Sequence, residues 1–206
     1  MITIAENDLE HVYPGTREAW RNWLTENHTQ TAPIWLIYDK VSAGNCRLTY
    51  DEAVEEALCF AWIDSKVNTL DATRFKQVFS PRKPNSTWSK VNKWRVEVLI
   101  AQGLMMPPGL AKIERAKQNG TWTVLDAIEE LIVPPDLMEA LAENAMARNY
   151  FEKFSPSSKK VILYWIQSAK RPETRQKRIE ETVRLAGQNI KANQPQRRTP
   201  EQIFLP

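Results

Sequence analysis

The stretch from Cys59 to Lys90, CFAWIDSKVNTLDATRFKQVFSPRKPNSTWSK, decides the fold. The apolar residues before it follow a helical period, which changes to strict alternation near Trp62, so we expect a helix to end there. Residues 63–69 and 73–80 then alternate between apolar and polar side chains around the turn at residues 70–72. This pattern predicts an antiparallel hairpin with one apolar and one charged face.

The residues on either side of the hairpin predict helices and one further strand. Thr49 and Glu52 form a capping box at the start of the helix that leads into the hairpin. The run IWLIYDK after Pro33 reads as a buried strand, and a helix from Thr16 to about Asn27 precedes it. After the hairpin, we expect a helix from Ser86 or Thr87 to residue 103 and another over residues 107–120.

The C-terminal part of the sequence predicts only helices. Asn144 and Ser155 are expected N-caps, Pro172 is expected to begin a helix, and Gly187 is expected to end it. The predicted fold class is therefore α+β: a small antiparallel or mixed sheet with packed helices, followed by an all-helical segment. The expected domains are an α+β core over residues 1–122, a helical segment over 123–190 and a mobile tail over 191–206.

Charge is distributed in alternating blocks along the 206 residues, although the formal net charge is only +3. Lys and Arg number 4 against 10 Asp and Glu in residues 1–60, then 11 against 4 in 61–120, 1 against 6 in 121–150, and 12 against 5 in 151–206. Such blocks either attract one another within the fold or present two basic surfaces to a polyanion.

Cysteine and histidine usage gives no metal site. Cys46 and Cys59 form no CxxC pair, and with His11 and His28 they supply no convincing zinc ligand set. We interpret His28, near the end of the first helix, as a structural residue favoured by the helix dipole. The first ten residues lack the basic start and apolar core of a signal peptide, and no apolar run is long enough to span a bilayer, so we expect the cytoplasm and no membrane insertion.

The hairpin and the following loop contain the candidate ligand-binding residues. A proline-stiffened loop that ends at a helix N-terminus presents free backbone N–H groups to an anion. Arginine forks bind carboxylate or phosphate, and indole rings offer flat faces to a ring or sugar. The predicted ligand-binding set is Trp62, Asp64, Lys66, Arg74, Arg82, Lys83, Trp88 and Ser89.

Alternative interpretations apply to the same residues. In one alternative, Ser86 or Thr87 only caps the helix, Trp88 packs inward and the basic pair is solvated. Asp64 is either a general base or a member of an ordinary cross-strand ion pair. The basic blocks at 61–120 and 151–206 could contact nucleic acid, although no DNA- or RNA-reading motif accompanies them.

Three segments resemble the YdeI/OmpD-associated family, also labelled bacteriocin-protection, with an OmdA-type C-terminal segment. They are EALCFAWIDSKVNTLD, FSPRKPNSTWSKVN and SPSSKKVILYWIQSAKRPETRQKRIEETV, and the resemblance covers about residues 15–190. It implies a cytoplasmic bacterial protein linked to antimicrobial and stress resistance. Where the family reads C-F-G-W-I-D-G, Ala61 and Ser65 replace the glycines, and Ser65 would be strained if its position required a positive φ.

Together these observations predict a non-catalytic protein that binds a small anionic ligand in an aromatic and basic pocket. We assign no catalytic residue, cofactor or metal, and the oligomeric state is left open. The alternatives are a nucleic-acid-binding module that uses the two basic blocks and an enzyme with Asp64 as general base.

Overall fold

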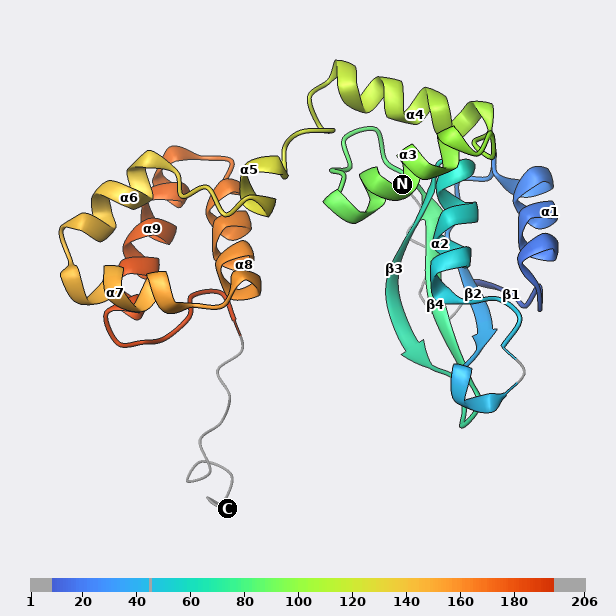
Figure 1. The fold of residues 1–206 in the computed structure, drawn as a ribbon, viewed down its shortest axis with the longest axis horizontal. Coiled ribbons are helices and arrows are strands. Elements are labelled where there is room, and N and C mark those ends of the chain that lie inside the picture. Colours follow the sequence, from blue (N-terminus) through green and yellow to red (C-terminus); the bar gives the residue numbers. More distant parts are fainter. Residues whose placement is uncertain (1–8, 45, 195–206) are drawn as a thin grey trace. The chain divides into compact units, whose positions relative to one another are not determined.

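The structure is a computed structural model that describes residues 9–44 and 46–194. Tertiary contacts divide the chain into two compact units, with the division between Val124 and Leu125. Figure 1 labels the elements of both. The predicted mobile tail lies outside the described residues from residue 195 onward.

Unit 1 contains a four-stranded mixed sheet, which confirms the predicted α+β class. The strand order is β1-β2-β4-β3; β1 pairs with β2 in parallel, and the other pairs are antiparallel. The strands are β1 (Glu10–Val12), β2 (Ile34–Asp39), β3 (Trp62–Thr69) and β4 (Arg74–Pro81).

Strands β3 and β4 form the predicted hairpin, but a bulge interrupts its alternation. Asp64 lies opposite Phe79, whereas Val67 lies opposite Gln77, so the register shifts between these two pairs. A bulge inserts an unpaired residue and changes which side chains face the core. The expectation of one uninterrupted apolar face along residues 63–69 was therefore wrong: Trp62 and Asp64 share the face of Phe79, and Trp62 is buried.

The first three α-helices of unit 1 each begin at a residue whose side chain caps the first turn. Thr16 accepts from the backbone N–H of Ala19, and the Thr49–Glu52 capping box is formed, as predicted. The third helix begins later than predicted because Ser89, and not Ser86 or Thr87, is its cap. The helices are α1 (Arg17–Asn27), α2 (Tyr50–Cys59), α3 (Lys90–Ala101) and α4 (Pro107–Gln118), with a 3₁₀ turn, η2, at Val41–Ala43.

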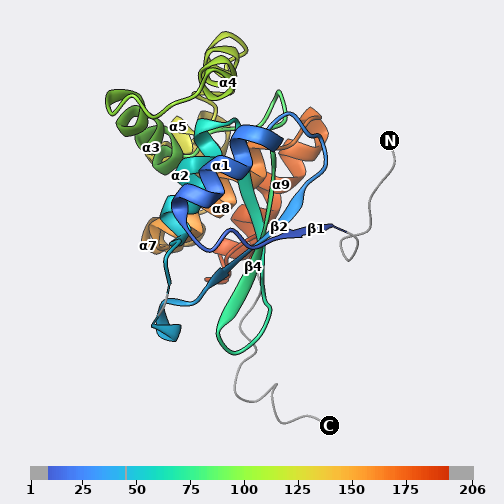
Figure 2. The same ribbon diagram turned by 90° about the vertical axis from the view of Figure 1, so that its right-hand side faces the viewer.

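Helices α1 and α2 cover the sheet face that carries Ile34, Leu36 and Phe79 (Figure 2). The buried Trp20 of α1 ties the two helices together because its indole N–H donates to the carbonyl of Ala53 at 3.0 Å. Helix α2 is central, since it also contacts β3, α3 and α4. The C-terminal end of α2 is therefore surrounded by several elements, and this is where the site described below lies.

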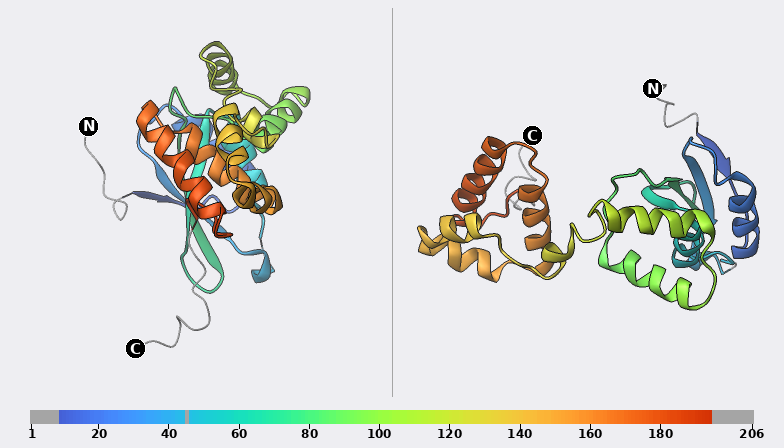
Figure 3. Two further views of the ribbon diagram at one scale, coloured as in Figure 1. Left: turned by 90° about the vertical axis from the view of Figure 1, so that its left-hand side faces the viewer. Right: turned by 90° about the horizontal axis from the view of Figure 1, so that it is seen from above.

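Unit 2 is all-helical, as the right-hand view of Figure 3 shows, and it has a hydrophobic core of its own. Asn144 and Ser155 cap their helices as predicted, and Gly187 follows the last one. Its helices are α5 (Asp126–Glu129), α6 (Pro135–Ala142), α7 (Ala145–Lys153), α8 (Pro156–Gln167) and α9 (Pro172–Ala186). In the described part of the chain, no helix has the length and apolar character needed to cross a membrane.

Candidate functional site

The structure buries both indole rings that were expected to stack on a ligand. Trp62 has 0% of its surface exposed, and its indole N–H donates to the carbonyl of His28 at 3.0 Å. This bond satisfies a carbonyl at the C-terminal end of α1, where helices leave carbonyls unpaired. Trp62 therefore stabilises the fold, and its prediction as a stacking platform was wrong.

Trp88 is also unavailable to a ligand ring. Its exposed fraction is 1%, and its two ring neighbours are the Arg82 guanidinium, 3.7 Å from the ring centroid, and Trp122 at 5.1 Å. An inward-packed Trp88 was the alternative interpretation, and this part of it is confirmed. The basic neighbour is not solvated as that alternative required, because Arg82 is itself only 3% exposed.

The other predicted ligand-binding residues are not gathered around one hollow. Arg74 pairs with Asp71 at the hairpin end, where the Arg74 bond holds the pKa of the Asp71 carboxyl below its usual range. Ser89 caps α3, and Lys66 and Lys83 are exposed.

Asp64 of β3 belongs to a chain of side-chain hydrogen bonds that links α2, β3, β4 and β2. Its carboxylate accepts from the Tyr50 hydroxyl at 3.1 Å and from the Gln77 amide at 2.8 Å. The Gln77 side-chain oxygen in turn accepts from the hydroxyl of Tyr38, and burial raises the pKa of that phenol. A general-base role for Asp64 stays a prediction, since its contacts are those of a structural acceptor.

Arg82 is the unusual member of the predicted set. Its Nη2 donates to the Thr87 carbonyl at 2.7 Å, but Nε and Nη1 are buried and have no hydrogen-bond partner. Burial lowers the pKa of Arg82 to about 10, and the nearby Asp64 opposes this shift. Because unpaired buried donors destabilise a fold, this guanidinium calls for an explanation in terms of function.

A pocket of about 330 Å³ lies next to Arg82, at the C-terminal end of α2. The Arg82 backbone N–H donates to the Ala61 carbonyl, and both Ala61 and the preceding Pro81 line the pocket. We call it the basic pocket. Its lining residues are His28, Phe60, Ala61, Pro81, Pro108, Ala111, Lys112 and Arg115.

Helix α4 supplies half of the lining from one of its faces. Pro108, Ala111, Lys112 and Arg115 recur at the spacing that places side chains on one helical stripe. The helix lies close to the end of α2 because Gly109 has no side chain: a Cβ there would stand 2.3 Å from the Cys59 carbonyl oxygen. Gly109 thus allows α4 to bring its two cations to the pocket.

Ala61 forms the pocket wall in a strained backbone conformation. It has φ 65°, in the left-handed region that non-glycine residues rarely adopt. The resemblance had raised this question for Ser65, but Ser65 is not among the positive-φ residues; the strained glycine replacement is Ala61.

His28 contributes an imidazole whose tautomer follows from its contacts. Its Nδ1 lies 3.1 Å from the Leu24 carbonyl oxygen and 3.2 Å from that of Thr25. Carbonyl oxygens only accept, so Nδ1 carries the proton and Nε2 is the atom left for other interactions. The interpretation of His28 as a structural residue at the helix end agrees with these bonds, and the pocket gives it a second role.

The basic pocket is lined by positive charges from Lys112 and Arg115 and by no negative charge. The pKa of Lys112 is lowered by partial burial and by the positive charges of Arg115 and Arg82. No carboxylate is among the lining residues of the basic pocket. The described residues also contain no group of three or more His, Cys, Asp or Glu side chains that could hold a metal. The arrangement is suited to binding an anion.

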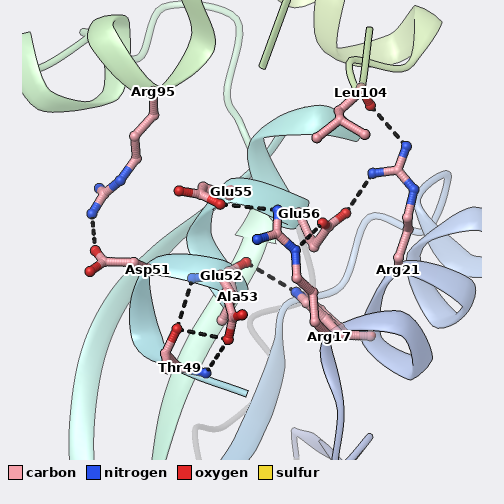
Figure 4. A network of polar contacts seen from close by, with 11 residues as sticks. Arg17, Arg21, Thr49, Asp51, Glu52, Ala53, Glu55, Glu56, Arg95 and Leu104 are labelled. Atoms are coloured by element: carbon pink, nitrogen blue, oxygen red, sulfur yellow. Dashed lines mark hydrogen bonds and ion pairs between the residues drawn. The ribbon is translucent and has the colours of Figure 1, made fainter. Parts of the chain in front are cut away.

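A buried carboxylate network supports the same end of α2 (Figure 4). Glu56 accepts from Arg17 at 2.7 Å and from Arg21 at 2.6 Å. Arg21 also donates to the Leu104 carbonyl at 2.8 Å and lies over the ring of Phe60. One guanidinium therefore contacts both a lining residue, Phe60, and the loop that leads into α4.

Sequence reasoning missed His28, Phe60, Ala61, Lys112 and Arg115 as members of a site. The stripe in PPGLAKIER carried a usable signal, since its two cations share a helical face with small apolar residues. The convergence of that stripe with the ends of α1, α2 and β4 depends on tertiary packing and has no local signature.

Two family models match separate parts of the chain. The model described as "Bacteriocin-protection, YdeI or OmpD-Associated" (OmdA) matches residues 130–189. The similarity to the OmdA family is confined to these residues. A different model, described as a domain of unknown function (DUF8412), matches residues 12–112. No curated protein and no solved structure matches the chain.

The OmdA match is narrower than the resemblance noted from the sequence. Only the third resembling segment lies within residues 130–189, whereas the first two lie within 12–112. The basic pocket is built from residues 28–115, so it lies outside the OmdA segment. The OmdA family name therefore says nothing directly about the pocket.

Several cations of the OmdA segment have partners within unit 2. Lys160 pairs with Glu129 at 2.5 Å, and Arg175 pairs with Asp136 at 2.6 Å. Arg178 donates to the Trp165 carbonyl and to Ser168. Lys170, Arg171 and Lys177 are exposed. Nucleic-acid binding by this block stays a prediction that salt-dependent binding would test.

Proposed function

We propose that unit 1 is a non-catalytic binding module that holds a small anionic ligand in the basic pocket. The observation that carries this proposal is the cluster of Lys112, Arg115 and Arg82, whose mutual repulsion no carboxylate of the lining relieves. Like charges that lower a neighbour's pKa are destabilising by themselves, and an anion between them removes that penalty. The proposal retains the ligand class expected from the sequence but moves the site to α4.

The walls of the pocket support a compact ligand with an apolar part. Ala61, Pro81 and Pro108 present apolar surface next to the two cations. A volume of about 330 Å³ is near the lower end of the roughly 300–1,000 Å³ typical of small-molecule sites. The lining contains no carboxylate, serine or cysteine, which favours binding over catalysis.

The OmdA description supplies the cellular setting that we propose. Its printed words, bacteriocin-protection, support a role in resistance to bacteriocins or related stress, and we propose a cytoplasmic location. In this proposal, unit 1 binds the ligand and the OmdA segment serves the resistance role.

A thermal-shift screen tests the proposed function. Inorganic phosphate, citrate, sugar phosphates and nucleotides are added to the full chain and to the double variant Lys112→Ala/Arg115→Ala. A ligand at a hundredfold excess over its dissociation constant stabilises the native state by about 2.7 kcal/mol. We expect at least one anion to stabilise the native protein but not the double variant.

The matched control is Lys90→Ala, which removes an exposed cation outside the pocket. This variant should respond as the native protein does. Equal stabilisation of all three proteins would place anion binding elsewhere on the surface and refute the proposed site.

A further inference from the structure

The basic pocket has more positive charge than a monoanion would offset. Lys112 and Arg115 line it, and the charge of Arg82 is close enough to contribute to the lowered pKa of Lys112. A carboxylate would leave a net charge of about two among these three groups. A dianion offsets more of the repulsion, and its tetrahedral oxygens can accept from several donors at once.

The unpaired donors of Arg82 are a second, independent observation. Nε and Nη1 are both buried without a partner, in a residue that is 3% exposed. Arg82 is joined to the pocket wall through its backbone bond to Ala61 at 2.8 Å. A buried guanidinium with two unpaired donors and no carboxylate bonded to it is unfavourable in the free protein, so negative charge brought next to this wall relieves an existing electrostatic penalty.

Apart from His28, the remaining lining is apolar. Pro81 and Pro108 offer rigid surfaces that lose no side-chain entropy on binding, whereas the Phe60 ring is buried and belongs to the floor of the pocket. Inorganic phosphate alone would leave these surfaces in contact with water, whereas a ligand with a small ring or alkyl group would cover them. The pocket thus has a cationic part, which suits the anionic group of a ligand, and an apolar part, which suits its organic group.

We propose that the ligand is a phosphate monoester of a compact apolar group, with its phosphate at Lys112 and Arg115 and its organic group against Pro81, Pro108 and Ala111. This inference rests on the proposed function and adds the chemical class of the ligand. The Arg82 charge, behind the Ala61–Pro81 wall, adds to the preference for a dianion. Phosphate esters have a second pKa of about 6, so they are dianions at pH 7.5.

Isothermal titration calorimetry with three probes at constant ionic strength tests the inference. The probes are phenyl phosphate, benzoate and inorganic phosphate, with the full chain at pH 7.5. We expect phenyl phosphate to bind at least tenfold more tightly than either of the others. We also expect Lys112→Gln and Arg115→Gln to weaken phenyl phosphate tenfold or more, and Lys90→Gln to leave it within twofold.

Each other outcome has a definite meaning. If benzoate binds as tightly as phenyl phosphate, the dianion preference is wrong while the anion site stands. If inorganic phosphate binds as tightly, the apolar walls take no part and the ester assignment is wrong. If no probe binds at millimolar concentration, or if binding is the same in the Lys112 and Arg115 variants, the proposed function falls together with this inference.

A proton-linkage measurement at pH 9 distinguishes Lys112 from the other groups at the pocket. The charged or titratable groups there are His28, Lys112, Arg115 and Arg82. At pH 9 the phosphate ester is a dianion, and Lys112 and Arg82 are the groups at the pocket whose pKa values are lowered, so proton uptake on binding reports on these two. We expect phenyl phosphate to cause proton uptake in buffers of different ionisation enthalpy, and Lys112→Arg to reduce it by at least half. Uptake that is unchanged in Lys112→Arg would contradict direct contact between Lys112 and the phosphate.

Discussion

Ala61 lines the basic pocket with a strained backbone conformation. Its φ of 65° places it in the left-handed region, which costs a non-glycine residue about 1–2 kcal/mol. Replacing Ala61 with glycine should remove this strain, while glycine loses about 0.5–1 kcal/mol through its larger unfolded-state entropy. We therefore expect Ala61→Gly to raise the free energy of unfolding by about 0.5–1 kcal/mol in urea denaturation.

Ala111→Gly is the matched control for this prediction. Ala111 is exposed on the ordinary helical backbone of α4, where glycine should destabilise by about 1 kcal/mol. A loss of stability in both variants would show that the Ala61 backbone is not strained in solution.

Arg82 illustrates a side chain whose burial opposes stability. Replacing it with methionine removes an unpaired buried charge and leaves an apolar side chain against Trp88, at the loss of one bond to the Thr87 carbonyl. Exchanging buried charges for apolar groups is often neutral or stabilising by about 1–4 kcal/mol. We expect Arg82→Met to leave the free energy of unfolding unchanged or higher, while anion binding weakens.

The pH range of this effect follows from the pKa of Arg82, which burial lowers to about 10. Above the folded-state pKa of such a basic group, the unfolded state binds more protons than the folded state, so the free energy of unfolding rises with pH. Below that pKa, the group is protonated in both states and contributes no pH dependence. The difference between Arg82→Met and the native protein should therefore be constant from pH 6 to 9.

Arg21→Met is the matched comparison, because Arg21 donates to the buried Glu56. It should destabilise by about 1.5–3 kcal/mol, as expected for a lost bond to a charged group. A similar loss in Arg82→Met would mean that Arg82 is an ordinary structural residue.

At the scale of elements, the position of α4 depends on its close approach to the end of α2. A methyl group at Gly109 would stand 2.3 Å from the Cys59 carbonyl oxygen and 2.8 Å from that of Leu58, and backbone atoms cannot yield as a flexible side chain can. We expect Gly109→Ala to destabilise by about 1–3 kcal/mol, the usual effect of overpacking.

The same variant should weaken anion binding, because α4 carries Lys112 and Arg115. Calorimetry with phenyl phosphate measures this effect, and Leu110→Gly, at an exposed α4 position outside the pocket lining, controls for a change on the same helix. Native affinity in a destabilised Gly109→Ala would separate the pocket from the α2–α4 contact.

The elements that sequence reasoning predicted well are those whose signals are local. Thr16, Thr49, Asn144 and Ser155 cap their helices within three residues of themselves, so each start could be read from a short window. The start of α3 was misplaced because several serine and threonine residues compete there, and packing selects Ser89. The bulge between Asp64 and Val67 was missed because alternation alone does not reveal an inserted residue.

The candidate site was harder to predict because it depends on contacts between distant segments. Trp62 and Trp88 looked like ligand platforms beside so many cations, but a large indole stabilises a fold most when it is buried. Arg82 is the residue shared by the predicted set and the neighbourhood of the basic pocket. Lys112 and Arg115 can be recognised as site residues only when α4 is placed against the ends of α1, α2 and β4.

At the scale of the whole molecule, each compact unit has a separate hydrophobic core. Leu137 is fully buried in the core of unit 2, and Leu137→Ala should destabilise that unit by about 2–5 kcal/mol. Hydrogen–deuterium exchange should therefore become faster in α6–α9 and stay unchanged in α1 and α2. Faster exchange in both units would show that the two cores unfold as one.

No carboxylate of the pocket lining offsets the charges of Lys112 and Arg115 in the free protein, and we propose that an anion takes that place. The most direct test of this proposal is the pKa of Lys112, measured by ¹³C NMR of the lysine ε-carbon and assigned through Lys112→Arg. We predict a pKa below the ordinary lysine value of about 10.4 in the free protein, and a higher pKa once saturating inorganic phosphate is added. An ordinary pKa that phosphate does not change would contradict the account.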